Sequence, residues 1–278
     1  MQLRQAMLIN GTLFNSEAWH GITLSQIKAF EKVDEALLRG ILASHSKGPV
    51  PALYMEVAQL PVRFILASRR ILYLHNILHR NEKELIKKVY NAQKADPSKG
   101  DYCKLVESDM NMIDLKLTEQ EITNISRFEF KTVVRRRTRE AGIKYLEEIK
   151  ETKSKMDGIL YTGSFDLQPY LQSSLFTQEE SSLLLALRTR TIRGVRSDFG
   201  EMYPDRNCPL PGCTEPDSPP HILVCSALSP VQGENCTVQY SDVFSNSEQL
   251  QWAATSLYSQ LLAERERLQE TGKPNQTS

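Results

Sequence analysis

Three cysteines and a histidine lie close together in the last third of the chain, at spacings that suit a metal ion. Four residues separate Cys208 from Cys213, seven more lead to His221, and three separate His221 from Cys225. Zinc binds four thiolate or imidazole ligands in a tetrahedron, and a Cys-Pro-Leu-Pro-Gly-Cys turn can aim two thiolates at one ion. His221 and Cys225 are four residues apart, so one helical turn would place both on one face. The spacing therefore predicts one structural Zn²⁺ site.

The predicted zinc site is closed, because all four ligands are protein side chains. A closed site stabilises the local fold, whereas hydrolytic zinc keeps an open position for water. Residues 197–245 are rich in Pro, Gly, Ser and Cys and show no helical period, so we expect them to need a metal to fold. Two alternatives stay open: Cys236 could replace one of the ligands, or the four side chains could be unrelated.

Two runs of arginine are candidates for binding nucleic acid. A guanidinium group binds phosphate through two parallel hydrogen bonds, and such contacts give affinity without reading sequence. One run lies in the middle of the chain, and the other directly precedes the predicted zinc segment. The first comprises Lys131, Arg135, Arg136, Arg137 and Arg139, and the second comprises Arg188, Arg190, Arg193 and Arg196.

The two runs differ in their acidic surroundings. The first could equally be a solvated helix face paired with Glu140, Glu147 and Glu148. The second has fewer acids nearby and is therefore favoured as the nucleic-acid site. The chain has 34 basic and 34 acidic side chains and a net charge of zero. This sum does not exclude nucleic-acid binding, because the distribution of charge matters more than its total.

No catalytic motif accompanies these residues. The sequence lacks the glycine-rich loops that hold phosphates and any recognisable nucleophile elbow. It also contains no Asp-Asp pair of the kind that holds two magnesium ions in polymerases. We therefore expect the chain not to be an enzyme.

The amino-terminal residues do not resemble a secretory signal, and no window approaches the ~18 consecutive apolar residues of a membrane span. Five cysteines in a chain of 278 residues do not suggest a disulfide framework. We expect an intracellular protein of the cytoplasm or nucleus that is neither secreted nor bound to a membrane.

Apolar residues at helical spacing and helix-capping signals predict a mainly α fold. Thr23 can cap a helix that runs to about Leu42. Thr118 with Glu121 forms a capping box, which opens a long charged helix to about residue 155. A break near Gly142 is an alternative. A second capping box, formed by Thr177 with Glu180, opens the helix that carries the second basic run.

These elements predict a helical thumb-like lobe, a long charged helix and a second helical lobe with a small zinc-stapled segment. The predicted parts are a thumb-like domain over 1–100, a charged helical linker over 101–176, a basic helix, zinc knuckle and C-terminal helix over 177–271, and a disordered tail over 272–278.

Three segments together carry a family resemblance. They are Leu13-Phe14-Asn15-Ser16-Glu17-Ala18-Trp19, then Met55-Glu56-Val57-Ala58-Gln59 leading into a helix with the pair Arg69-Arg70, and finally the cysteine-histidine knuckle. In this order the chain resembles the region after the polymerase palm of non-LTR retrotransposon reverse transcriptases, from the thumb to the zinc knuckle. Two departures are clear. The glycine of the family's Leu-Glu-x-Gly-like second motif is replaced here, and four residues rather than two separate the first two cysteines.

The resemblance implies a non-catalytic C-terminal region of a reverse transcriptase, which holds RNA or DNA through a basic helix and a Cys3His knuckle. Polymerase activity in that family requires fingers and palm, whose paired aspartates are missing from this sequence. The alternative interpretation is a zinc-stapled helical module that binds a protein and not nucleic acid. The predicted C-terminal helix over 247–271 would then contact the protein partner.

Overall fold

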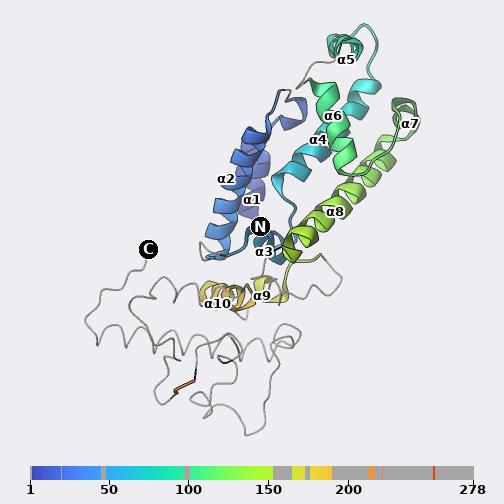
Figure 1. Ribbon diagram of the computed structural model, residues 1–278. Helices are drawn as coiled ribbons and strands as arrows, with labels where there is room; N and C mark the ends of the chain where they lie inside the picture. Colours follow the sequence, from blue (N-terminus) through green and yellow to red (C-terminus); the bar gives the residue numbers. More distant parts are fainter. Residues whose placement is uncertain are drawn as a thin grey trace. The chain divides into compact units, whose positions relative to one another are not determined.

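The computed structural model is helical in the residues that it describes (Figure 1). These are residues 2–19, 21–44, 48–96, 101–152, 165–172, 176–189, 213–215, 221 and 253. They contain no strand, which confirms the predicted mainly α fold. Within the same ranges, no helix combines the length and apolar character that crossing a membrane requires. The predicted helix over 247–271 lies outside the described residues, apart from Ala253.

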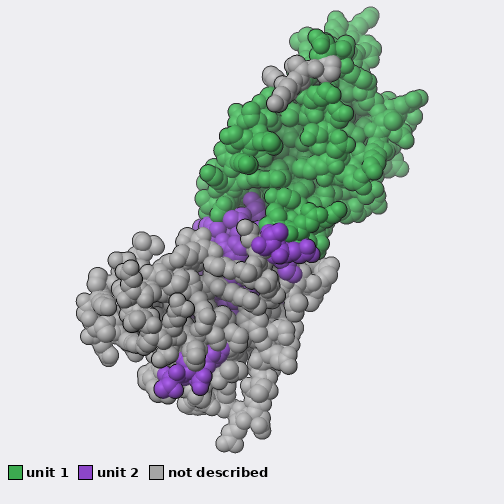
Figure 2. Space-filling view, viewed as in Figure 1, with its two compact units in different colours: residues 1–38, 58–149 green, residues 39–57, 150–278 purple. Residues whose placement is uncertain are grey.

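The helical elements are α1 (Gln2–Arg4), the π-helical η1 (Gln5–Thr12), the 3-10 helix η2 (Ser16–Ala18), α2 (Leu24–Leu42), α3 (Val50–Glu56), α4 (Val62–Leu78), α5 (Leu85–Ala95), α6 (Tyr102–Met112), α7 (Glu119–Asn124), α8 (Arg127–Glu151), α9 (Pro169–Gln172) and α10 (Gln178–Arg188). The chain divides into two compact units (Figure 2). Unit 1 comprises residues 1–38 and 58–149, and unit 2 comprises residues 39–57 and 150–278. The part of the predicted charged linker up to residue 149 thus belongs to unit 1.

Helix α4 is the central element of unit 1. It contacts η2 on one side and α5, α6 and α7 on others. One apolar cluster joins α4 to α5, α6, α7 and α8, and includes Phe64, Ile71 and Phe130. A second cluster joins α4 to the amino-terminal segment and includes Leu13 and Leu66. Because α4 is apolar on more than one side, it can bury surface against both groups of elements, and this burial is the main driving force for folding.

Two buried ion pairs lie between the helices of unit 1. Arg4 on α1 donates to both carboxylate oxygens of Asp34 on α2, at 2.6 and 2.7 Å. Arg70 on α4 donates to both oxygens of Asp109 on α6, at 2.6 and 2.8 Å. Both arginines are 2% exposed. Removing one partner of such a pair would leave an uncompensated buried charge, at a cost of about 3–5 kcal/mol.

Arg69 on α4 is hydrogen-bonded to the amino-terminal segment. Its guanidinium donates to the carbonyl of Leu13, to the Ser16 hydroxyl at 3.1 Å and to the Ile9 carbonyl at 2.9 Å. Between these acceptors, Asn15 has a φ of 59°, in the left-handed region that asparagine and glycine tolerate best. The amino-terminal turn is therefore attached to α4 by an arginine whose acceptors are all uncharged.

The predicted long helix after Thr118 is divided at Ile125, not at Gly142. Thr118 and Glu121 form the predicted capping box, but Ile125 is extended, and its carbonyl accepts a hydrogen bond from His75 Nε2 at 3.1 Å. Ser126 then caps α8 by a reciprocal exchange with Glu129.

Gly142 lies inside α8 and leaves the helix unbroken. A Cβ atom at this position would come within 2.6 Å of the Leu60 side chain. The glycine therefore permits close packing of α8 against Leu60, and it does not mark a helix end.

In unit 2 a buried carboxylate joins three segments. The Glu56 side chain is fully buried at the end of α3 and accepts hydrogen bonds from the Tyr170 hydroxyl at 2.7 Å and from Arg188 Nε at 2.6 Å. Its backbone carbonyl accepts a further bond from the Gln168 amide at 3.0 Å. Thr177 and Glu180 form the predicted capping box of α10. One acidic side chain thus holds α3, α9 and α10 together.

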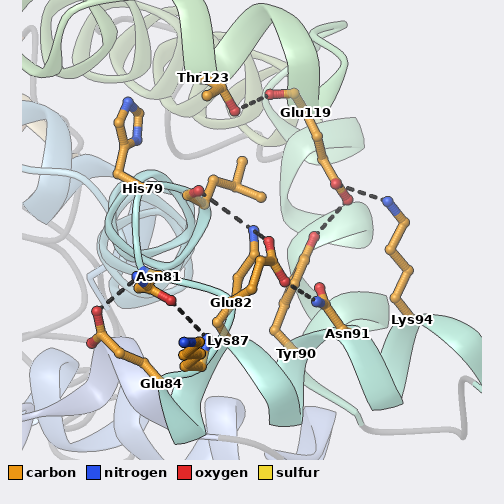
Figure 3. A network of polar contacts seen from close by, with 12 residues as sticks. His79, Asn81, Glu82, Glu84, Lys87, Tyr90, Asn91, Lys94, Glu119 and Thr123 are labelled. Carbon is orange, nitrogen blue, oxygen red and sulfur yellow. Dashed lines mark hydrogen bonds and ion pairs between the residues drawn. The ribbon is translucent and has the colours of Figure 1, made fainter.

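Glu119 connects α7 to α5 through the polar network of Figure 3. It accepts hydrogen bonds from the Tyr90 hydroxyl at 2.7 Å and from Lys94 Nζ at 2.8 Å. Burial alone would raise the pKa of this carboxyl, but the bonds from Lys94 and Tyr90 and the nearby lysine charges lower it below the ordinary value of 4.5. The network therefore stabilises the ionised form of Glu119.

Replacing Ala58 with glycine should stabilise the folded protein. The Ala58 φ of 51° lies in the left-handed region, which glycine adopts without steric cost. Because an L residue there costs roughly 1–2 kcal/mol relative to glycine, Ala58→Gly should raise the free energy of unfolding by about 1 kcal/mol. Chemical denaturation measures this change. Ala92→Gly, inside α5 at an exposed position, is the control and should have the opposite sign. A loss of stability in Ala58→Gly would contradict the backbone assignment.

The Glu119 network should lose its stabilising effect in acid. Because the folded pKa lies below 4.5, the contribution is complete above that value and disappears as the pH falls through the folded pKa. Glu119→Gln should therefore be less stable than wild type at about pH 6, and this deficit should be smaller at about pH 3. Denaturant unfolding at both pH values measures the difference. Glu107→Gln, which changes an exposed carboxylate on α6, is the control, and its free energy of unfolding should differ little from wild type at either pH. An equal loss of stability in Glu119→Gln at both pH values would contradict a role for the ionised carboxylate.

Candidate metal and nucleic-acid sites

Two of the four predicted zinc ligands are described, and they lie side by side. Cys213 Sγ is 3.3 Å from His221 Nε2, although seven residues separate them in the sequence. Cys213 forms no disulfide and is partly buried. Cys208 and Cys225 lie outside the described residues, as does Cys236. Among the described residues, no group of three or more metal-binding side chains occurs.

The distance between Cys213 and His221 can be compared with tetrahedral geometry. With zinc bonds of about 2.3 Å to sulfur and about 2.0–2.1 Å to nitrogen, two ligands of one tetrahedral ion lie roughly 3.5 Å apart. The 3.3 Å separation is close to this value. It is also suitable for a thiol–imidazole hydrogen bond. The donor pair therefore fits zinc in chemical type and in spacing.

His75 on α4 and His79 directly after this helix have ordinary structural partners. His75 and His79 stack with ring centroids 4.1 Å apart. Nε2 of His75 meets the Ile125 carbonyl, and Nδ1 of His79 meets the His75 carbonyl at 2.8 Å. Cys103 on α6 is half-buried, and its thiol lies 3.6 Å from the Tyr90 carbonyl. Each of these side chains thus has a local packing role.

The first basic run lies on α8 and is exposed along most of its length. Part of it forms the intrahelical pairs expected of a solvated face, because Arg136 and Arg137 lie 3.9 and 3.5 Å from Glu140. Both partners are well exposed, so these ion pairs contribute little to stability. Arg135 and Arg139 are also exposed.

A regular stripe of cations emerges when Arg127 is included. Arg127, Lys131, Arg135 and Arg139 follow one another at intervals of four residues, and all four are exposed. At this spacing each side chain neighbours the next, and the row rises about 6 Å per step and about 18 Å in total while it turns by roughly 40° per step around the helix. We name these four residues the basic stripe. They run beside the buried face of α8, which carries Phe130, Val134, Thr138, Gly142 and Leu146.

The prediction for Arg188 in the second run is wrong. Arg188 is 5% exposed, and its guanidinium forms the ion pair with Glu56. A buried, neutralised arginine cannot reach a phosphate, so its role is structural. The arginines that follow it, Arg190, Arg193 and Arg196, lie outside the described residues.

A groove in unit 1 involves residues that the sequence analysis did not select as site residues. Its volume is about 980 Å³, and the amino-terminal turn, α4 and the start of α8 line it. Phe14 and Phe128 lie on it with exposed fractions of 72% and 79%. The sequence carried a signal for Phe128, because this residue lies between Arg127 and Lys131, and a mixture of aromatic and basic residues is typical of nucleic-acid binding.

Comparison of the chain with protein-family models, with curated proteins and with solved structures finds no match in any of the three. The chemistry of the residues described above is therefore what indicates a function. Two arrangements carry it: the thiol–imidazole pair and the basic stripe.

The predicted zinc site gives a direct expectation for metal content. The purified chain should carry about one equivalent of zinc, since four protein ligands form one closed site. Cys213→Ser and His221→Ala should each lose most of it. Cys103→Ser, which changes a thiol on α6, should retain it. Elemental analysis after gel filtration measures the metal, and a full equivalent of zinc in Cys213→Ser would exclude this cysteine as a ligand.

Proposed function

We propose that the chain is a non-catalytic nucleic-acid-binding region, related to the thumb-to-knuckle part of non-LTR retrotransposon reverse transcriptases. It holds RNA or DNA through phosphate contacts. The basic stripe on α8 is the observation that carries this proposal. It presents four exposed cations at regular spacing along about 18 Å of helix, as an extended polyanion requires.

The balance of charge along α8 supports phosphate binding. Arg127, Lys131 and Arg135 form no ion pair in the described part of the chain, so their charges are available to a ligand. The nearest acids are occupied elsewhere. Glu129 caps the helix at Ser126, and Glu140 pairs with the arginines beside it. Each phosphate that the stripe neutralises would release condensed counterions, which makes affinity fall with salt.

Three features support the relation to the reverse transcriptase region. Asn15 occupies a left-handed position where the family has glycine or asparagine, and Ala58 occupies another where the family has glycine. Arg69, from the arginine pair of the second motif, is hydrogen-bonded to Leu13 and Ser16 of the first. The residues that carry the resemblance thus lie at backbone positions that favour glycine or asparagine, and two of the motifs are hydrogen-bonded to each other.

The zinc knuckle belongs to the same proposal. Cys213 and His221, with Cys208 and Cys225, would bind one structural Zn²⁺, which supplies local folding energy and no reaction. Arg190, Arg193 and Arg196 precede the knuckle in the sequence, and their guanidinium groups would bind further phosphates. The expectation that the chain is not an enzyme remains part of this proposal.

The test is a salt series of binding to a short RNA–DNA hybrid. Arg135→Gln/Arg139→Gln removes two cations from the stripe while glutamine keeps a similar helix propensity. The slope of log affinity against log salt should become shallower by about 1.8, because each phosphate that is no longer neutralised changes it by about 0.9. Fluorescence anisotropy at several salt concentrations measures the slopes of wild type and variant.

A matched control lies on α2. Lys28 and Lys32 are also exposed and four residues apart, so Lys28→Gln/Lys32→Gln removes the same charge from another helix. This variant should keep the wild-type slope. Equal effects of the two variants would mean that only net charge matters and would contradict a stripe-specific site. No binding by wild type that carries its zinc would favour a zinc-stapled protein-interaction module.

A further inference from the structure

The groove at the start of α8 combines exposed aromatic faces with positive charge. Phe14 comes from the turn before η2, and Phe128 comes from the first turn of α8. Both are more than 70% exposed, although burial of a phenylalanine is normally favourable. Single-stranded nucleic acids bind to such aromatic faces, because every base has a π-face that can stack.

The walls of the groove are positively charged. Arg127 and Lys131 line one side, and Arg69 lines another. The hydrogen bonds of Arg69 end on uncharged oxygens, and no carboxylate of the described residues neutralises it. Glu17 is the one acidic residue among the described residues of the lining, against three cations. The groove therefore attracts an anion.

Polar groups suited to base edges complete the lining. Asn10, Asn15 and Asn76 each provide an amide that can both donate and accept a hydrogen bond. The volume of about 980 Å³ lies at the upper end of the range of roughly 300–1,000 Å³ that holds drug-sized ligands. A single base is smaller than such a ligand, so the groove has room for more than one.

The groove is continuous with the basic stripe, because Arg127 and Lys131 belong to both. A strand whose phosphates follow the stripe would therefore bring its end to the two phenylalanines. We infer that the groove binds unpaired nucleotides that extend from a duplex, with their bases stacked on Phe14 and Phe128. This inference rests on the proposed function and adds the form of nucleic acid that the site recognises.

The test compares two probes of the same RNA–DNA hybrid, one blunt and one with about six unpaired thymidines, a length within the roughly 4–16 nucleotides that single-strand sites cover. Wild type should bind the tailed hybrid about tenfold more tightly for each stacked base. Phe14→Ala/Phe128→Ala should lose this gain and keep the affinity for the blunt hybrid. Both side chains are exposed, so the variant should remain folded, which thermal unfolding checks.

Two further variants make the result specific. Phe14→Tyr/Phe128→Tyr keeps the aromatic faces and should keep the gain. Leu24→Ala/Leu85→Ala removes two apolar side chains that are 78% and 77% exposed outside the groove, and it should also keep the gain.

The outcomes separate the inference from the proposed function. Salt-dependent binding of the blunt hybrid with no gain from the tail would overturn the inference and leave the proposed function standing. A gain retained in Phe14→Ala/Phe128→Ala would also overturn it. No binding of either probe would overturn both. Binding of an acidic leucine-rich peptide that requires both phenylalanines, with no gain from the tail, would assign the groove to a protein partner instead.

Discussion

The pairing of buried arginines with buried carboxylates is the constraint on which this helical structure depends. In the described residues, each arginine that is almost fully buried contacts an acidic side chain that is itself buried. The pairs are Arg4–Asp34, Arg70–Asp109 and Arg188–Glu56. An unpaired ion in the interior costs several kcal/mol, so each of these charged side chains can be buried only together with its partner. Each pair joins helices that are distant in the sequence, and two of the three pairs lie in unit 1.

This constraint also sorts the arginines by what they can do. A buried guanidinium whose hydrogen bonds end on a carboxylate has no charge left for a ligand, and Arg188 is the clearest case. Arg69 differs, since its hydrogen bonds end on uncharged oxygens while it lines the groove. The arginines of the basic stripe differ again, because all three are exposed on the surface of α8. The site proposed for nucleic acid therefore uses exposed positive charges of unit 1 that are not part of a buried ion pair.

Local chemistry made much of this fold predictable. The capping boxes at Thr118 and Thr177 require only residues three positions apart, and both were predicted from the sequence. The division of the long helix at Ile125 was missed. The alternative of a break at Gly142 was wrong, because the effect of Gly142 depends on Leu60 from a distant segment. The burial of Arg188 depends on Glu56, 132 positions away, which no run of charges reveals. For the proposed zinc site, spacing predicted four ligands, and Cys213 and His221, the two that are described, lie together. The exposure of Phe128 could not be inferred from its helical position alone.

The central claim is that nucleic acid lies along the basic stripe of α8. The most direct measurement is photochemical crosslinking of an RNA–DNA hybrid that carries 5-bromouracil, followed by peptide mapping of the full chain. The account predicts that crosslinks concentrate in the peptides that cover residues 127–139, at the start of α8. Crosslinks confined to α2, or their absence from α8 under conditions in which the hybrid is bound, would contradict it.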